Sequence, residues 1–266
     1  MAELTRREQR IMSHLKTHLE DCVKKYPDHE WVGIFLCGSQ NYQLDTFGSD
    51  IDSKFIVLPT LEDIALMREP ISEKLSIPGG EFAEVKDIRL MFGCYRKQNV
   101  NFVETLFTQF RIVNPDWADL FQPMLDNNEK IARYNKTQAI HTMCGMIRER
   151  YKRFEIQYGT GQHDSSVCDH KAASHIVRIA EFIGRYIAGE PYADCLIPRD
   201  KGLLMDYKSR QLAPAYVAEQ AKAAKLYAQS VALAYKTSPS KPDEETGKLM
   251  DNVLIETFRR LLSKSQ

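Results

Sequence analysis

The chain has 266 residues, enough for one large domain or two modest ones with a buried core. Hydrophobic residues make up 43% and charged residues 27%, and 36 basic residues balance 36 acidic ones, so net charge favours neither nucleic acid nor membrane as a partner. No apolar run reaches the roughly 18 residues of a membrane span, and the polar first ten residues do not resemble a secretory signal.

The cysteines are scattered through the chain and form no CxxC pair. This spacing argues against a zinc site, and a disulfide scaffold is not expected in a chain of this length. We therefore expect reduced thiols in a cytoplasmic protein that has no membrane partner.

Strand and helix signals alternate in the first hundred residues. Apolar residues recur four apart at the N-terminus, which is typical of an amphipathic helix, whereas short β-branched and aromatic runs indicate buried strands. The predicted elements are, in chain order, a helix over 4–25, strands over 31–36 and 52–58, a helix over 60–75, a strand over 82–88 and a helix over 89–98.

Helical patterns dominate the rest of the chain, and the polar stretch 237–245 indicates a surface loop. The predicted helices cover 101–110, 116–126, 136–156, 169–188, 214–235 and 244–263. The sequence therefore predicts a small α/β domain over residues 1–115 and a mostly helical domain over 116–266. The boundary between them falls somewhere in 112–135.

The stretch that carries chemistry joins the first two predicted strands. Gly38-Ser39 ends the first, and Asp50-Ile51-Asp52 opens the second after a ten-residue spacer. A glycine turn lets backbone N–H groups approach a phosphate. Two acids spaced by two on a strand point to the same face, and Mg²⁺ prefers carboxylates together with phosphate oxygens. The order of these parts favours a site for Mg²⁺ and a triphosphate over a chance surface pair.

A third carboxylate would complete such a site, either as a general base or as a ligand of a second metal ion. The third predicted strand offers two. We favour Asp87, at the end of that strand, over Glu84, which would face the opposite way. The remaining alternative is that neither contributes and that they form surface ion pairs.

The stretch GSQNYQLDTFGSDIDSKFIVLP resembles the Gly-Ser…Asp-x-Asp signature of the DNA polymerase β-like nucleotidyltransferase superfamily. It looks closest to the bacterial and phage predicted nucleotidyltransferases of the RlaP type. Three later stretches are similar to that group, and together the similarity spans roughly residues 30–220. They are KDIRLMFGCYRKQNVNFVETLF, GMIRERYKRF and DHKAASHIVRIAEFIGRYIAGEPY. One departure is Gln43, where the group usually has glycine.

The resemblance implies a nucleotidyltransferase-type mixed sheet with helices, an α/β (α+β) fold, followed by a mostly helical C-terminal domain. It implies that Gly38 and Ser39 hold the triphosphate of a nucleoside triphosphate. Asp50 and Asp52 would bind Mg²⁺ or Mn²⁺, and Asp87 would be the third acid. The acceptors of this group are diverse, so the resemblance names none.

Three basic residues of the helical half lie on one predicted helix face: Lys171, His175 and Arg178. Such a face could neutralise a triphosphate or contact an acceptor, and we predict that these residues bind nucleotide. A solvated face with a satisfied histidine is the alternative. We interpret Asn99 and Glu104 as packing or capping residues near the active-site wall.

The leading hypothesis is a metal-dependent enzyme that transfers a nucleoside monophosphate from an NTP to a hydroxyl group and releases pyrophosphate. The acceptor stays open between an RNA end, a protein side chain and a small molecule. The alternative is a catalytically inactive nucleotide- or nucleic-acid-binding module of the same fold. The intact Asp50 and Asp52 argue against it.

Overall fold

The computed structural model describes residues 4–46, 48–159 and 169–264, without the side chains of residues 156–159. The chain divides into two compact units. Unit 1 comprises Met1–Asn41, Asp45–Tyr134 and Asp243–Gln266, and unit 2 comprises Tyr42–Leu44 and Asn135–Pro242. This division runs differently from the predicted boundary, because 116–134 and the C-terminal helix pack with the sheet-bearing unit.

Unit 1 is built on a five-stranded sheet with strand order β3-β4-β2-β1-β5. β2 pairs with β4 in parallel, while β1–β2, β1–β5 and β3–β4 are antiparallel pairs. The sheet is therefore mixed, as expected. The strands are β1 (Trp31–Cys37), β2 (Asp52–Val57), β3 (Ser72–Ile77), β4 (Glu81–Asp87) and β5 (Arg111–Val113).

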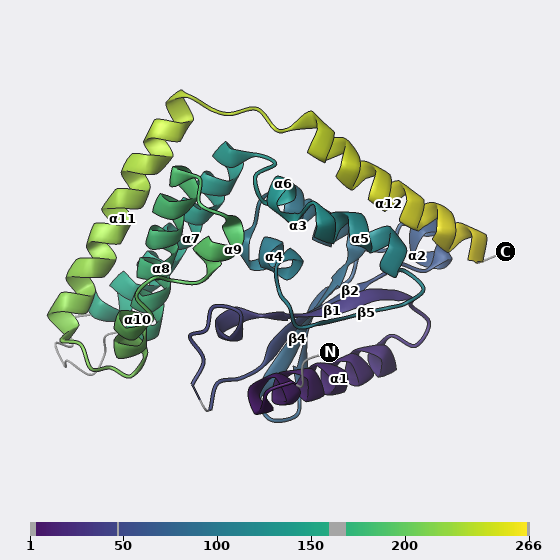
Figure 1. The fold of residues 1–266 in the computed structure, drawn as a ribbon, viewed down its shortest axis with the longest axis horizontal. Coiled ribbons are helices and arrows are strands. Elements are labelled where there is room, and N and C mark those ends of the chain that lie inside the picture. Colours follow the sequence, from purple (N-terminus) through teal and green to yellow (C-terminus); the bar gives the residue numbers. More distant parts are fainter. Residues whose placement is uncertain (1–3, 47, 160–168, 265–266) are drawn as a thin grey trace. The chain divides into compact units, whose positions relative to one another are not determined.

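One face of the sheet is covered by α1 (Arg6–Lys25), as Figure 1 shows. A capping box formed by Thr5 and Glu8 starts this helix. Its apolar stripe, including Ile11 and Leu15, packs with strand residues such as Phe55 into one buried core. Burial of these side chains holds α1 against the sheet.

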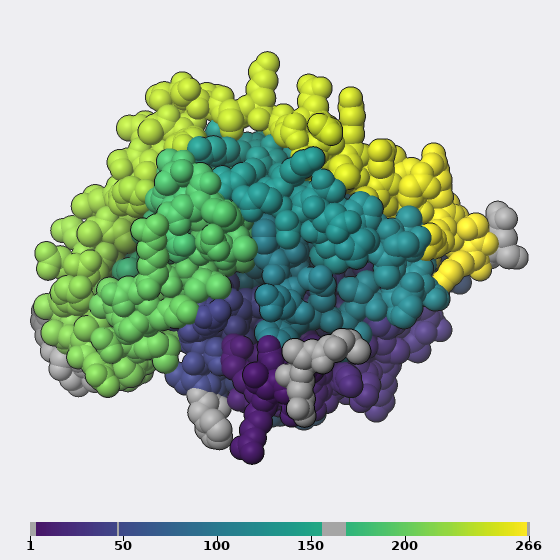
Figure 2. Space-filling view, viewed as in Figure 1, coloured from purple at the N-terminus to yellow at the C-terminus, as the bar shows by residue number. Residues whose placement is uncertain are grey.

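The opposite face carries short helices that follow the strands. α3 packs against β2 and β4, and α12 packs on α3 and α5. In the space-filling view the yellow α12 lies along the teal surface of α5 (Figure 2). The remaining helices of unit 1 are α2 (Leu61–Ala65), α3 (Ile88–Arg96), α4 (Val100–Val103), α5 (Ala118–Asp126), α6 (Asn128–Ala132) and α12 (Glu244–Lys264).

The helix predicted over 60–75 is wrong beyond Ala65. α2 begins after the capping residue Thr60 but ends at Ala65, and Met67 takes a φ of +50°, which a helix does not allow. β3 then pairs with β4 through a turn that contains Gly79 and Gly80, both with positive φ. The hairpin partner decides the structure of this segment, which local periodicity does not reveal.

Unit 2 is helical. Its long helices α7, α8 and α11 pack pairwise against one another. Tyr42 and Leu44, from the short segment that belongs to this unit, are buried, and the Lys208 ammonium group donates to the Leu44 carbonyl. Together with the mixed sheet, these helices confirm the predicted fold class. The helices are α7 (Lys136–Gly159), α8 (His170–Ala188), α9 (Tyr192–Leu196), α10 (Lys201–Lys208) and α11 (Pro214–Thr237).

None of the helices that the structure describes has the length and apolar character that crossing a bilayer requires.

Candidate active site

The end of β1 places a glycine turn beside an acidic side chain of β2. A 3-10 turn over Gly38–Gln40 follows the strand, and Gly38 has a φ of +80°, a conformation that favours glycine. A Cβ atom added at Gly38 would lie 3.7 Å from Oδ2 of Asp52. The Asn41 N–H closes the turn by donating to the Gly38 carbonyl over 3.0 Å. The structure therefore brings the predicted turn, which includes Ser39, to Asp52.

The two predicted metal-binding acids differ in their settings. β2 begins at Asp52, which is half-buried and lies opposite Cys37 of β1. Asp50 precedes the strand and is exposed. Side-chain alternation applies only within a strand, so the spacing of two does not fix the direction of Asp50. The pair consists of one carboxylate held by the sheet and one that faces solvent.

Asp87 does not lie with this pair. It is 1% exposed and pairs in register with Val57, at the opposite end of β2 from Asp52, a separation of about 16 Å along the strand. Its carboxylate caps α3 by accepting from the Arg89 amide over 2.8 Å, and it forms a 2.6 Å ion pair with the Arg89 guanidinium. These contacts correct the preference for Asp87 as third carboxylate, because they give it a capping role.

Glu84 lies on the face of the sheet that carries Asp52. It pairs in register with Lys54, which is two residues after Asp52 and so shares its side of β2. The carboxylate contacts the Lys54 ammonium over 2.5 Å and the Lys86 ammonium over 3.4 Å. Glu84 therefore shares with Asp52 a side of the sheet on which Asp87 does not lie.

The Lys54–Glu84 ion pair is partly buried, since Lys54 is only 5% exposed and the side chain of Glu84 is 20% exposed. Burial works to lower the pKa of Lys54, but the neighbouring acids Glu84 and Glu104 raise it overall. Burial works to raise the pKa of Glu84, but Lys54 and Lys86 lower it overall. Both groups therefore stay charged at neutral pH and hold each other in place.

Glu104 is an acidic neighbour of the Gly38 turn, which the sequence predicted only as a packing or capping residue near the active-site wall. It is 2% exposed, lies in a 3-10 turn over Glu104–Leu106, and accepts a 3.4 Å hydrogen bond from the Gly38 N–H. The signal available was a single acid inside the apolar run Phe-Val-Glu-Thr-Leu-Phe. Asn99 accepts from the Asn101 amide over 3.2 Å and caps α4, which confirms its capping interpretation.

Carboxylates on this face suit a divalent cation that arrives with its substrate. Within the described ranges, no three or more His, Cys, Asp or Glu side chains converge into a ready-made metal cage. Mg²⁺ needs no such cage, because it is bound by one or two carboxylates together with phosphate oxygens and water. Asp52 beside the Gly38 turn, together with Asp50 two residues before it, would supply such a donor set.

A hollow of about 440 Å³ lies in unit 1 between α1 and the segment that joins Gln40 to Ile51. Arg7 forms a 2.8 Å ion pair with Asp45 and donates to the Gln40 carbonyl over 3.0 Å. Arg10 donates to the Ser49 carbonyl over 3.3 Å. These arginines tie the segment between the glycine turn and Asp50 to α1.

The predicted nucleotide-binding residues of α8 lie in unit 2. The Arg178 guanidinium lies 3.8 Å from the centroid of the Tyr42 ring. Arg178 is 4% exposed, and its Nη1 has no hydrogen-bond partner among the residues described. Burial, and then the charges of Arg178 and Arg150, lower the pKa of His175 to about 3, so its imidazole is neutral at pH 7. Lys171 is exposed.

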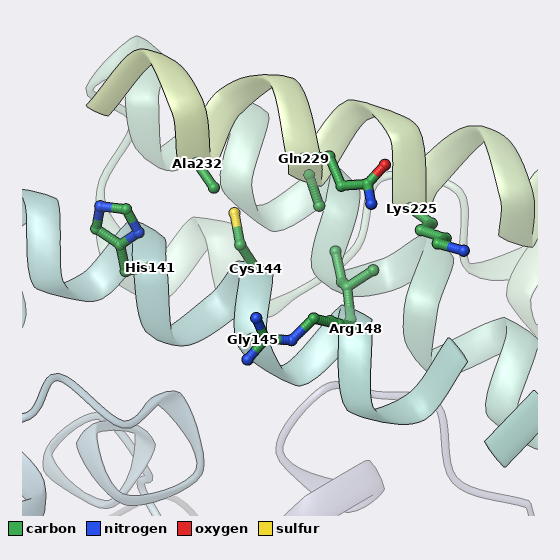
Figure 3. Close-up of a pocket in the computed structure, with 9 residues that line it drawn as sticks. His141, Cys144, Gly145, Arg148, Lys225, Gln229 and Ala232 are labelled. Carbon is green, nitrogen blue, oxygen red and sulfur yellow. The ribbon is translucent and has the colours of Figure 1, made fainter. Parts of the chain in front are cut away.

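A crevice of about 300 Å³ lies between α7 and α11 in unit 2 (Figure 3). Its lining contains no carboxylate, and burial raises the pKa of the Cys144 thiol to about 11, so the thiol is not a nucleophile at neutral pH. The crevice therefore lacks the carboxylate ligands that Mg²⁺ prefers. The lining residues are His141, Cys144, Gly145, Ile147, Arg148, Lys225, Ala228, Gln229 and Ala232.

No family model matches the chain, and no curated protein matches it in sequence. Among solved structures, the chain is similar to a nucleotidyltransferase-like protein from Exiguobacterium sibiricum 255-15. The two are 12% identical, and the match covers 92% of this chain and 80% of that one, with a TM-score of 0.33. At this TM-score the likeness has no bearing on function.

Proposed function

We propose that unit 1 catalyses metal-dependent transfer of a nucleoside monophosphate from an NTP to a hydroxyl group of an acceptor. The observation that carries the proposal is the 3.7 Å approach of the Asp52 carboxylate to the Cβ position of Gly38. It joins a metal-binding acid to a turn whose backbone can meet a phosphate. The resemblance of the Gly-Ser…Asp-x-Asp stretch to the polymerase β-like superfamily supports the same reaction.

In this reaction the acceptor oxygen forms a bond to the α-phosphorus, and the bond from that phosphorus to the bridging oxygen breaks. Pyrophosphate leaves with the electron pair of the broken bond. Asp50 and Asp52 would hold Mg²⁺, which when bound neutralises phosphate charge and stabilises the leaving oxygen. Ser39 and the backbone of the Gly38 turn would orient the triphosphate.

Glu84 has two roles open to it on this face. It would accept the proton of the acceptor hydroxyl or complete the cation site, and its partner Lys54 would then be released to a phosphate. The 2.5 Å contact between these side chains supports a shared role, because ligand binding at either one alters the charge that the other faces.

We further propose that Lys171, His175 and Arg178 contact an anionic part of the nucleotide or the acceptor. The support is the buried Arg178 guanidinium, whose Nη1 lacks a hydrogen-bond partner among the described residues. Buried donors of this kind are normally satisfied, so a bound anion would complete its hydrogen bonding. His175 would take part as a neutral donor or acceptor.

The test is incubation with each labelled NTP and Mg²⁺, in the presence of total RNA or cell extract, with pyrophosphate release as the second readout. We expect label transfer by the parent, and loss of it in Asp50→Asn and Asp52→Asn. Asp28→Asn, which alters an exposed acid in a turn of the same unit, is the matched control. Nucleotide binding without pyrophosphate release would support the inactive module instead.

A further inference from the structure

A buried polar chain links α1 to the strands on the side of the sheet that α1 covers. His18 is 0% exposed, and its Nε2 lies 3.0 Å from Oε2 of Glu81, the first residue of β4. Its Nδ1 lies 2.8 Å from the hydroxyl of Ser53 in β2. With Nε2–H donating to the carboxylate, the neutral ring accepts from the serine, so each polar atom has a partner.

The same carboxylate reaches the backbone between the two predicted metal-binding acids. Oε1 of Glu81 accepts a 3.0 Å hydrogen bond from the N–H of Ile51, and Oε2 also faces Nδ1 of His14 over 2.8 Å. Burial works to raise the pKa of Glu81, but the hydrogen bonds from His14, His18 and Ile51 lower it overall. Glu81 is therefore a carboxylate whose hydrogen bonds favour its charged form.

The order serine, histidine, carboxylate also occurs in nucleophilic catalysis, but this serine does not suit that use. Ser53 is 0% exposed, so no substrate carbonyl reaches its hydroxyl. The histidines and Glu81 do not form a metal site either, because no such group exists among the residues described. These polar groups instead contact the residues on either side of Asp52, through the amide of Ile51 and the side chain of Ser53.

We propose that Glu81, His18 and Ser53 form a positioning network that fixes the backbone on either side of Asp52 and so aims Asp50 and Asp52 at the cation. This inference rests on the proposed function. The amide that Glu81 holds is the one that joins Asp50 to Ile51, at the point where the loop enters β2. Substitution of residues that orient metal-binding carboxylates typically lowers metal affinity or activity by a factor of about 10 to 100.

The first test measures hydrogen exchange of the Ile51 amide by NMR and needs no activity. Glu81→Met keeps the side-chain bulk and removes both acceptors, so we expect the Ile51 amide to exchange about 10- to 100-fold faster. Glu81→Gln keeps one acceptor for Ile51, while His18 changes tautomer, so exchange should return close to that of the parent. Unchanged Ile51 exchange in Glu81→Met would overturn the proposal.

A matched control separates positioning from simple loss of stability. Leu15 lies on the same face of α1, one turn from His18, and is 0% exposed. Leu15→Ala opens a cavity there without changing a residue of the network. We expect it to lower Tm as Glu81→Met does but not to speed Ile51 exchange selectively over that of Ile56. Equal exchange in the two variants would mean that Glu81 acts only through stability.

The second test measures Mn²⁺ binding by electron paramagnetic resonance. We expect Glu81→Met to weaken Mn²⁺ binding about 10-fold and His14→Gln, which removes one exposed donor, to weaken it less. Parent affinity in Glu81→Met would overturn the positioning role. If Asp52→Asn bound Mn²⁺ as the parent does, the proposed function would fail instead, and Ile51 exchange would still decide whether Glu81 holds this amide.

Discussion

Both units bury charged side chains, but the partners of those charges differ. In unit 1 the buried Lys54 has Glu84 as its ion-pair partner 2.5 Å away. In unit 2 the buried Arg178 guanidinium lies against the Tyr42 ring, and its Nη1 lacks a hydrogen-bond partner among the described residues. A buried ion pair fixes geometry without adding much stability, whereas an unsatisfied donor costs free energy until an anion arrives. We therefore expect cation chemistry in unit 1 and anion binding in unit 2.

The largest expected effect comes from removing the Asp52 charge, which we propose holds the cation in unit 1. Asp52→Asn should lower the rate of pyrophosphate release by about 10³-fold or more, because the phosphate charge is no longer neutralised. The fold should survive, since the substitution keeps the shape of the side chain. The checks are steady-state kinetics and Tm. Parent-like turnover in Asp52→Asn would contradict the proposed cation chemistry of unit 1.

The next largest effect distinguishes two acids of β4 that lie on opposite sides of the sheet, Glu84 and Asp87. Glu84→Gln should slow turnover by about 10²-fold, because a general base or cation ligand is lost. Asp87→Asn should instead cost about 1 kcal/mol of unfolding free energy, through the weaker cap of α3, and leave kcat of the folded protein unchanged. Urea unfolding and kinetics on both variants check this. The reverse pattern would restore Asp87 as the third acid.

The sequence predicted what depends on local pattern. The runs around Phe35 and Phe55 are β-branched and aromatic, so their strands were predictable, and the Gly38 turn followed from the order of strand, glycine and acids. Predicting the face of Glu84 required the parallel register with Lys54, a pairing between segments 30 residues apart. Side-chain alternation alone predicted that Glu84 and Asp87 lie on opposite sides of the sheet. It could not show which of the two shares a side with Asp52.

Longer-range contacts were beyond the reach of periodicity. The carboxylate of Glu104 meets the amide of Gly38 across 66 positions, and helix patterns do not encode that approach. Gln43 illustrates the opposite case, because its φ of +55° is the left-handed conformation that glycine tolerates best. A glycine at this position would adopt that conformation without strain, and Gln43 itself leaves the acidic residues unchanged.

A smaller effect is expected from a substitution that tests anion binding in unit 2. Arg178→Lys keeps the charge but loses the planar fork that lies over Tyr42, so KM for the anionic ligand should rise about 10-fold with little change in kcat. Arg150→Lys, at an exposed position of α7, is the control and should bind as the parent does. Titration at several salt concentrations measures both. If the two variants behave alike, the buried guanidinium has no special role in binding.

The smallest expected effect concerns His175, whose pKa lies at about 3 because burial and two arginines disfavour its charged form. Between that value and the ordinary pKa of about 6.5, the unfolded chain binds a proton that the folded protein does not. The stability contribution is therefore complete above pH 6.5 and is lost as the pH falls toward 3. His175→Gln should reduce the drop in Tm between pH 7.5 and pH 5 by about 3 °C, whereas His141→Gln should not.

An anion bound at Arg178 would offset the repulsion between the Arg178 guanidinium and a protonated His175. Saturating inorganic phosphate should therefore also reduce the drop in Tm of the parent between pH 7.5 and pH 5. If phosphate leaves the parent's Tm profile unchanged, the basic residues of unit 2 do not form an anion site for this ligand.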